Sequence, residues 1–168
     1  MLNDIIIRLK MVGQFEKPIF IHKFRSMYPN AHEDYLNIVR ENGIDNIGKP
    51  ANDPRVTCWG KFMRKYFIDE IPQIYDLVIG TLSFVGIRPR SKEDWKNYSE
   101  KHKERALNHK PGLIGIHYYH LNSRNFGDII ESEKEYLDRI EKDGKEKTDY
   151  RYFNQIFENI ILRGLRSR

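Results

Sequence analysis

Charged residues interrupt this chain so often that it contains no long apolar segment. Lysine, arginine, aspartate and glutamate make up 32% of the 168 residues, and the longest stretches without them are Leu77–Ile87 and Pro111–Ser123. These two stretches, of 11 and 13 residues, are shorter than the roughly 17–25 apolar residues that a membrane-spanning helix needs. We therefore expect short amphipathic elements and no transmembrane segment in the chain.

The composition fits one globular domain. Hydrophobic residues make up 39% of the chain and aromatic residues 12%, which is enough to build a core. The single cysteine, Cys58, excludes an intramolecular disulfide framework and a cysteine-rich metal site. We expect Cys58 to be a small buried or half-buried apolar residue.

Glycine, proline and capping residues divide the chain into short predicted elements. Two β-branched and aromatic runs, Ile5–Lys10 and Ile19–Phe24, predict a hairpin, and Ser83–Val85 predicts a short extended piece before a turn at 86–89. Helices are predicted over Asn30–Asn42, Val56–Tyr66, Asp69–Gly80, Ser91–His109, Asp128–Asp143 and Asp149–Arg163, with a loop at Ile44–Asp53. The predicted class is α+β: one helix-rich domain with a short N-terminal β-hairpin.

The adjacent acids Asp69 and Glu70 are the most informative pair in the sequence. Asp69 can cap a helix whose first turn holds Pro72, where the missing N–H costs nothing. Neighbouring helical side chains point about 100° apart, so the pair cannot flank a glycosidic bond. The two carboxylates can serve one metal–phosphate complex, although such a pair is more often only a helix cap.

Basic residues elsewhere in the chain add phosphate-binding charge to this pair. They are Lys23 and Arg25 in one segment, Arg64 shortly before the acids, and Arg88 in the predicted turn. The net charge of +5 favours polyanionic partners in general. This charge is too diffuse along the chain to indicate a nucleic-acid-binding surface, and no nucleic-acid-binding motif is present. We therefore expect no nucleic-acid partner.

Four segments in order resemble the bacterial sugar transferases, the monotopic polyprenyl-phosphate phosphoglycosyltransferases. Each segment alone is a weak signal, but their order and spacing match the family across roughly residues 5–125. They are Lys-Phe-Arg-Ser-Met at 23–27, Asp-Glu-Ile-Pro-Gln at 69–73, Gly-Thr-Leu-Ser-Phe-Val-Gly-Ile-Arg-Pro at 80–89, and Lys-Pro-Gly-Leu-Ile-Gly at 110–115.

The resemblance implies a function and a set of site residues. It implies transfer of a sugar-1-phosphate from a UDP-sugar to polyprenyl phosphate through a covalent aspartyl-phosphosugar intermediate, the first membrane step of surface glycan biosynthesis. Asp69 would be the nucleophile, Glu70 would help to hold Mg²⁺ beside it, and basic side chains would bind substrate phosphate. Those basic residues are Lys23, Arg25, Arg64, Arg88 and Arg124.

The chain also departs from the family pattern. It begins at residues that would follow the family's N-terminal re-entrant membrane helix, through truncation or because this member docks differently, so residues 1–168 would be the catalytic domain alone. Ile87 replaces the first proline of the proline-arginine-proline turn, and Arg90 stands where an acid is common. The stretch between Gly115 and Arg124 is two residues longer than usual.

Two features outside these motifs allow two interpretations each. His117 and His120 are more plausibly pocket-lining or packing residues than metal ligands, and the same holds for the two tyrosines between them. An apolar stripe from Phe153 to Ile161 is more often core, and the alternative is an interfacial helix on anionic lipid. We expect weak peripheral binding of the basic chain to the cytoplasmic face of an anionic membrane.

Two functional classes follow from these observations. The favoured one is the phosphoglycosyltransferase itself, and the intact motif at 69–73 supports it. The alternative is a weakly active or inactive accessory homologue that binds a nucleotide-sugar or a membrane partner, which the altered turn at Ile87 favours.

Overall fold

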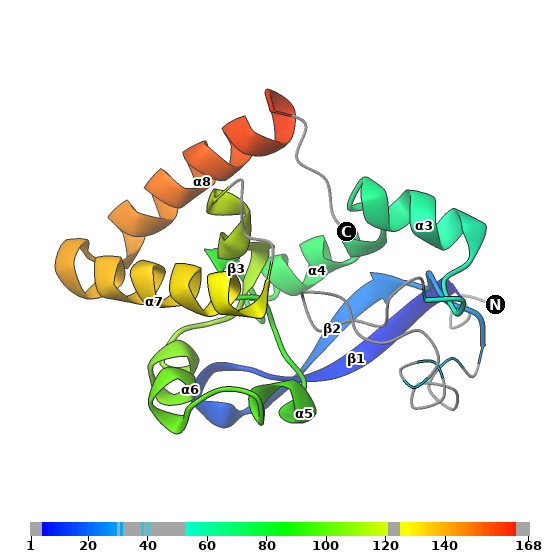
Figure 1. Ribbon diagram of the computed structural model, residues 1–168, viewed down its shortest axis with the longest axis horizontal. Helices are drawn as coiled ribbons and strands as arrows, with labels where there is room; N and C mark the ends of the chain where they lie inside the picture. Colours follow the sequence, from blue (N-terminus) through cyan, green and yellow to red (C-terminus); the bar gives the residue numbers. More distant parts are fainter. Residues whose placement is uncertain are drawn as a thin grey trace.

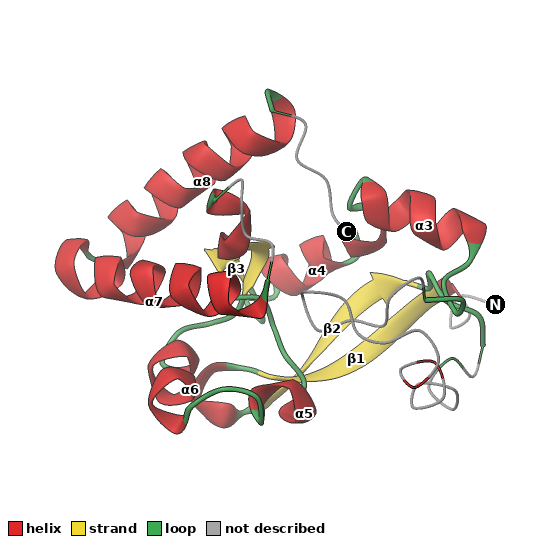
Figure 2. Cartoon of the chain, viewed as in Figure 1, coloured by secondary structure: helices red, strands yellow, loops and turns green. Residues whose placement is uncertain are grey.

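The computed structural model describes residues 5–29, 53–120 and 125–163, together with Ala31, Ile38 and Arg40. The helix predicted over Asn30–Asn42 and the loop predicted over Ile44–Asp53 lie almost wholly outside the described residues. The α+β class is confirmed: a β-hairpin and a set of helices surround a second, short pair of strands (Figure 1, Figure 2).

The N-terminal hairpin has the predicted form. Strand β1 (Ile6–Val12) pairs antiparallel with β2 (Pro18–Phe24), and the 3-10 turn η1 (Gln14–Glu16) joins them. The register sets Ile7 opposite Lys23, near the open end of the hairpin. Ile21 is buried on β2, so one face of the hairpin packs inward and fixes which way the basic side chains point.

Helix α3 (Cys58–Lys65) follows the hairpin, and its cap is Thr57, whose hydroxyl accepts the Gly60 amide at 2.8 Å. This helix confirms the prediction over Val56–Tyr66. The expectation for Cys58 was wrong, because this first residue of the helix is exposed.

The expected helix cap at Asp69 was also wrong. Phe67 has a left-handed backbone (φ 60°), and the chain then makes the 3-10 turn η2 (Ile68–Glu70) before α4 (Gln73–Val78) begins. Pro72 occupies the cap position of α4, which has no side-chain cap. Because α4 starts after Pro72, the acidic pair lies in the tight turn ahead of the helix, and Asp69 is buried there.

A second pair of strands holds the middle of the chain together. Strand β3 (Ser83–Gly86) runs parallel to β4 (Gly112–Gly115), which the sequence did not predict as a strand. Gly86 and Gly112 touch backbone to backbone, and a Cβ on Gly112 would overlap the Gly86 amide. Glycine is therefore required for this close pairing.

The segment between these strands was predicted as one helix, Ser91–His109, and that was wrong. It forms α5 (Lys92–Trp95) and α6 (Glu100–Leu107), and a separate cap, Ser99, starts the second helix. The predicted capping box of Ser91 and Asp94 is present at the start of α5.

Two long helices complete the fold. The turn η3 (Ile116–Tyr119) leads toward α7 (Phe126–Asp143) and α8 (Lys145–Ile161), which form a helical hairpin at one side of the molecule (Figure 1). The chain reverses at Gly144, whose φ of 83° suits glycine. This turn places the start of α8 four residues before the predicted Asp149.

The main core lies between β3, α5, α6, η3 and the α7–α8 hairpin. The apolar stripe on α8 is core only in part: Ile156 is buried and Phe153 packs against the core, whereas Phe157 and Ile161 are more than half exposed. Within the described part of the chain, none of the helices is both long enough and apolar enough to cross a bilayer. The central core residues are Val85, Ile87, Trp95, Tyr98, Ala106, Leu107, Ile116, Tyr136, Leu137, Ile140, Tyr152 and Ile156.

Candidate active site

Three separate elements bring charged side chains to one place. The turn η2 carries Asp69 and Glu70 and lies against β2, which carries Lys23. The loop that leaves β3 brings Arg88, because Ile87 beside it is anchored in the core. The predicted phosphate-binding residues Lys23 and Arg88 are therefore brought to the acidic pair.

Glu70 is the centre of this cluster. Its Oε1 accepts a hydrogen bond from Lys23 Nζ at 3.0 Å and a second from Arg88 Nη2. Burial alone would raise the pKa of the Glu70 carboxyl, but the charges of Arg88 and Lys23 outweigh burial and lower it to about 2. Glu70 is therefore ionised throughout the physiological range.

Asp69 lies beside this ion pair and is itself buried. Its Oδ2 is 3.8 Å from Lys23 Nζ, so the lysine faces both carboxylates. Burial and the nearby Arg88 charge lower the pKa of Lys23, and the two carboxylates oppose that change. Lys23 thus bridges the two acids.

Arg64 approaches the same region from α3. Its Nε donates to the Ser26 hydroxyl at 2.9 Å, which fixes the guanidinium next to the end of β2. Burial lowers the pKa of Arg64, whereas the negative charge of Asp69 favours its cationic form. Arg64 is thus close enough to Asp69 for the two charges to interact, and its role in binding phosphate stays a prediction.

Arg88 is enclosed more closely than the sequence suggested. Burial opposes its charge, but the Glu70 carboxylate outweighs burial and raises the pKa of the guanidinium. A Cβ on Gly115 would lie 2.6 Å from Arg88 Cγ, so this glycine leaves room for the arginine side chain. Tyr118, for which the sequence allowed a pocket-lining or a packing role, interacts with Arg88 and packs its ring on Phe67 at 5.4 Å.

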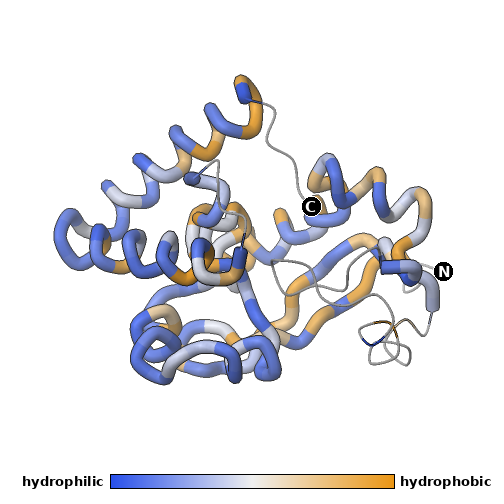
Figure 3. Tube along the Cα trace, viewed as in Figure 1, coloured by the Kyte–Doolittle hydropathy of each residue, from blue (hydrophilic) through white to orange (hydrophobic). Residues whose placement is uncertain are grey.

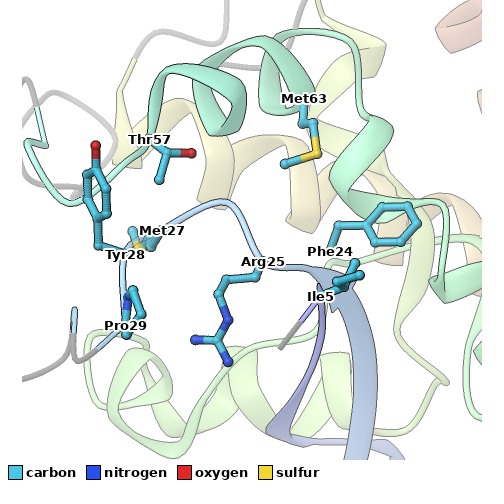
Figure 4. A pocket seen from close by; sticks show the side chains of 8 residues that line it. All are labelled: Ile5, Phe24, Arg25, Met27, Tyr28, Pro29, Thr57 and Met63. Carbon is cyan, nitrogen blue, oxygen red and sulfur yellow. The ribbon is translucent and has the colours of Figure 1, made fainter. Parts of the chain in front are cut away.

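Two predicted phosphate-binding residues, Arg25 and Arg124, are not among the cations described at the acidic pair. Arg25 lies in the lining of a largely apolar pocket of about 360 Å³ between the strand ends and α3, and it is the one charged group among the described lining residues (Figure 4). Arg124 lies outside the described residues, so its predicted role stays a prediction. The described lining residues are Ile5, Phe24, Arg25, Met27, Tyr28, Pro29, Thr57 and Met63.

Sequence reasoning missed a second acid–base pair beside the site. Asp76 of α4 is fully buried; its Oδ2 accepts the backbone amide of His22 and its Oδ1 lies 2.7 Å from the His22 ring nitrogen Nδ1. The pair attaches α4 to the outer edge of β2 and so holds η2 against Lys23. No local pattern could have indicated this pair, because His22 and Asp76 are 54 residues apart in the sequence.

The acidic pair fits a magnesium ion only in company with phosphate oxygens. Across residues 5–29, 53–120 and 125–163, no three His, Cys, Asp or Glu side chains gather as a metal cluster. Magnesium commonly binds through one or two carboxylates and completes its shell with water and substrate phosphates. Asp69 and Glu70 Oε2, the oxygen to which neither the Lys23 nor the Arg88 hydrogen bond is made, supply that kind of donor set.

The arrangement as a whole suits an anionic substrate. Three cations, Lys23, Arg64 and Arg88, accompany the two carboxylates, so the cluster retains positive charge for a phosphate while holding one buried carboxylate available for attack. Phosphoryl transfer depends mostly on positioning and on charge stabilisation of the transferred group, and this cluster provides both.

Comparison with known proteins agrees with these observations. Residues 2–155 match the model of the family described as "Bacterial sugar transferase". The chain is 34% identical over 75% of its length to the galactosyl transferase CpsE of Streptococcus agalactiae, and covers 28% of that protein. It is 32% identical over 76% of its length to the undecaprenyl-phosphate galactose phosphotransferase of Salmonella typhimurium, and covers 27% of that protein.

A third relative comes from Klebsiella pneumoniae and is named UDP-glucose:undecaprenyl-phosphate glucose-1-phosphate transferase. It is 36% identical over 68% of this chain, which covers 23% of the relative. The chain thus spans about a quarter of the length of the curated relatives that it matches. The predicted family is confirmed: this chain belongs to the bacterial sugar transferase family.

Proposed function

We propose that the chain is the catalytic part of a phosphoglycosyltransferase that moves a sugar-1-phosphate from a UDP-sugar to polyprenyl phosphate in surface glycan biosynthesis. The observation that carries the proposal is the buried carboxylate of Asp69 next to Glu70, with cations from three separate elements around the pair. The relatives' names, which specify undecaprenyl phosphate and sugar phosphates, support the same substrate classes.

In the first step Asp69 acts as the nucleophile. A carboxylate oxygen attacks the phosphorus that carries the sugar, the bond from that phosphorus to the bridging oxygen breaks, and UMP leaves with the electron pair on its oxygen. The product is an acyl phosphate that links Asp69 to the phosphosugar.

In the second step a phosphate oxygen of polyprenyl phosphate attacks the same phosphorus. The acyl phosphate bond breaks, the Asp69 carboxylate is restored, and the sugar leaves as a polyprenyl diphosphate conjugate. Both steps exchange one phosphorus–oxygen bond for another, so neither requires a redox partner.

The surrounding side chains bind and orient the phosphates. Arg88 and Lys23 hold Glu70 ionised and in place, so that its remaining oxygen can serve as a ligand to Mg²⁺. When bound, the ion would neutralise charge on the diphosphate. Arg64, fixed by Ser26, would face the same phosphates from α3.

The direct test is UMP release. The protein is incubated with Mg²⁺, polyprenyl phosphate and each of a panel of UDP-sugars, alongside Asp69→Asn, which keeps the shape of the side chain and removes its nucleophilic charge. We expect release with at least one donor and a loss of more than a hundredfold in the variant. No release with any donor, or turnover by the variant within tenfold of the parent, contradicts the proposal.

The surface around α3 supports the lipid half of the proposal. The rings of Trp59, Phe62 and Tyr66 follow one another along this helix. The ring centroids of Trp59 and Phe62 are 6.0 Å apart, those of Phe62 and Tyr66 are 4.9 Å apart, and Trp59 is 75% exposed. The exposed Lys61 and Lys65 lie on the same helix. Apolar positions also occur on α4 and at the end of α8 (Figure 3). Exposed rings beside basic groups are typical of a surface that contacts anionic lipid.

Vesicle flotation tests this part separately from catalysis. We expect binding to anionic vesicles that falls as salt increases, and a loss of at least fivefold when Trp59 and Phe62 are both changed to serine. Tyr150→Ser, at an aromatic residue of α8 that is 70% exposed, is the control. Flotation that is unaffected by the double change would show that α3 does not face the bilayer.

A further inference from the structure

A second group of buried charges, centred on Arg90, contacts the backbone at Arg88. Arg90 Nη2 donates to Glu133 Oε1 of α7, and the other oxygen of Glu133 lies 2.8 Å from His102 Nε2 of α6. Glu133 and His102 are 2% and 5% exposed, so the group is part of the core. A buried carboxylate is costly unless it is paired, and here two partners satisfy it.

Aromatic rings enclose the guanidinium of Arg90. Its central carbon lies 5.2 Å from the Trp95 ring centroid and 4.6 Å from that of Tyr98, and the His102 ring stacks on Tyr98 at 5.3 Å. Arginine stacks on rings and binds carboxylates through a planar fork, so these contacts together allow one orientation of Arg90.

The group is connected directly to the loop after β3 that carries Arg88. Arg90 Nη1 donates to the carbonyl oxygen of Arg88 at 3.4 Å, and the Arg90 carbonyl accepts the Val12 amide at 2.8 Å. The loop is therefore tied to α7 through a side chain and to β1 through the backbone. β1 in turn pairs with β2, which carries Lys23, so the attachment joins the two parts of the chain whose cations contact Glu70.

We propose that Arg90 and Glu133 are positioning residues, which fix the loop so that Arg88 meets Glu70. This inference rests on the proposed function for its catalytic consequence, but the geometry that it describes can be tested without turnover. It also gives a role to Arg90, which occupies a position where the family commonly has an acid. In this chain the acid comes from α7, as the Glu133 carboxylate that Arg90 binds.

The test observes Arg88 itself. In protein labelled with ¹⁵N-arginine, the Nε–H resonance of Arg88 is assigned by its loss in Arg88→Lys. Glu133→Gln, which removes the charge and keeps the size of the side chain, should shift that resonance and speed its exchange with water at least tenfold. Asp138→Asn, which breaks the exposed pair of α7 with Arg105, is the matched control and should leave the resonance unchanged.

Arg90→Lys is the second variant, and it keeps the positive charge. If circular dichroism shows that Glu133→Gln folds poorly, the Arg88 resonance is measured in Arg90→Lys instead. It should also move the Arg88 resonance, since lysine cannot reproduce the planar fork. A folded variant of either kind with an unmoved Arg88 resonance overturns the proposal.

Kinetics supply the second readout. We expect Glu133→Gln to lower kcat for UMP release at least tenfold with a smaller change in KM, and to lower it less than threefold further in an Arg88→Lys background, because both changes act through one side chain. Equal losses in both backgrounds contradict the proposal. A parent protein that releases no UMP contradicts the proposed function alone, and the Arg88 resonance then decides the positioning role.

Discussion

Replacing Glu70 by glutamine should change how the stability of this protein depends on pH. The carboxyl has an ordinary pKa of 4.5, and Arg88 and Lys23 lower it to about 2 in the folded protein despite burial. The folded pKa is below the unfolded one, so the pairing stabilises the fold above pH 4.5, and this stabilisation is lost as the pH falls toward 2.

The size of the effect follows from the shift of the pKa. A difference of about 2.5 pKa units corresponds to about 3 kcal/mol of unfolding free energy at neutral pH. The stabilisation by Glu70 falls to roughly half of this value by pH 3. At that pH the carboxyl binds few protons in the folded protein, whereas it is almost fully protonated in the unfolded chain. In Glu70→Gln the contribution is absent at every pH.

Urea unfolding followed by circular dichroism measures the contribution of Glu70 to stability directly. The free energy of unfolding is determined at pH 7, 5, 4 and 3 for the parent and for Glu70→Gln. Glu158→Gln, which breaks an exposed pair with Arg163, is the control and should change stability by less than about 1 kcal/mol. A difference between parent and Glu70→Gln that is constant from pH 7 to pH 3 would refute the reasoning, because it would show that Glu70 titrates normally in the fold.

Three further predictions follow from individual residues. If Glu70 is a ligand to magnesium, Glu70→Gln should raise the Mg²⁺ concentration needed for half-maximal UMP release at least fivefold, and unchanged activity in excess chelator would remove that role. Gly60→Ala should destabilise the protein by about 1–3 kcal/mol in urea unfolding, because the new Cβ would overlap the backbone carbonyl oxygen of Ser26, which accepts the Thr57 amide; parent-like stability would contradict this. The exposed Cys58 should react with one equivalent of a thiol reagent in the native state, and labelling that requires denaturant would show that it is covered.

The sequence predicted the fold best where local signals decide it. The hairpin, the capping box at Ser91 and the long helix α7 all depend on turn, cap and periodicity signals within a few residues of each other. Strand β4 could not be predicted in this way, because it exists through close contact of Gly112 with Gly86 across the sequence. The break between α5 and α6 has a local signal, the cap Ser99, which the longer helical pattern around it concealed.

The sequence predicted which residues form the candidate site, but not how those residues contact one another. The motifs named Lys23, Arg88 and the acidic pair, and the structure brings these four together. That Arg88 and Lys23 share one oxygen of Glu70 follows from the packing of β2, η2 and the loop after β3, which no local pattern encodes. The attachment of Arg90 to Glu133 is likewise a tertiary contact between positions 43 residues apart.

The most direct test of the account is a search for the phosphosugar on Asp69. The protein is mixed with Mg²⁺ and the UDP-sugar that gives UMP release, without polyprenyl phosphate, and its intact mass is measured after rapid quenching. We predict a mass increase of one phosphosugar that maps to the peptide containing Asp69, disappears when polyprenyl phosphate is added, and is absent in Asp69→Asn. Turnover without any such adduct, or an adduct on another residue, would contradict the assignment of Asp69 as the nucleophile.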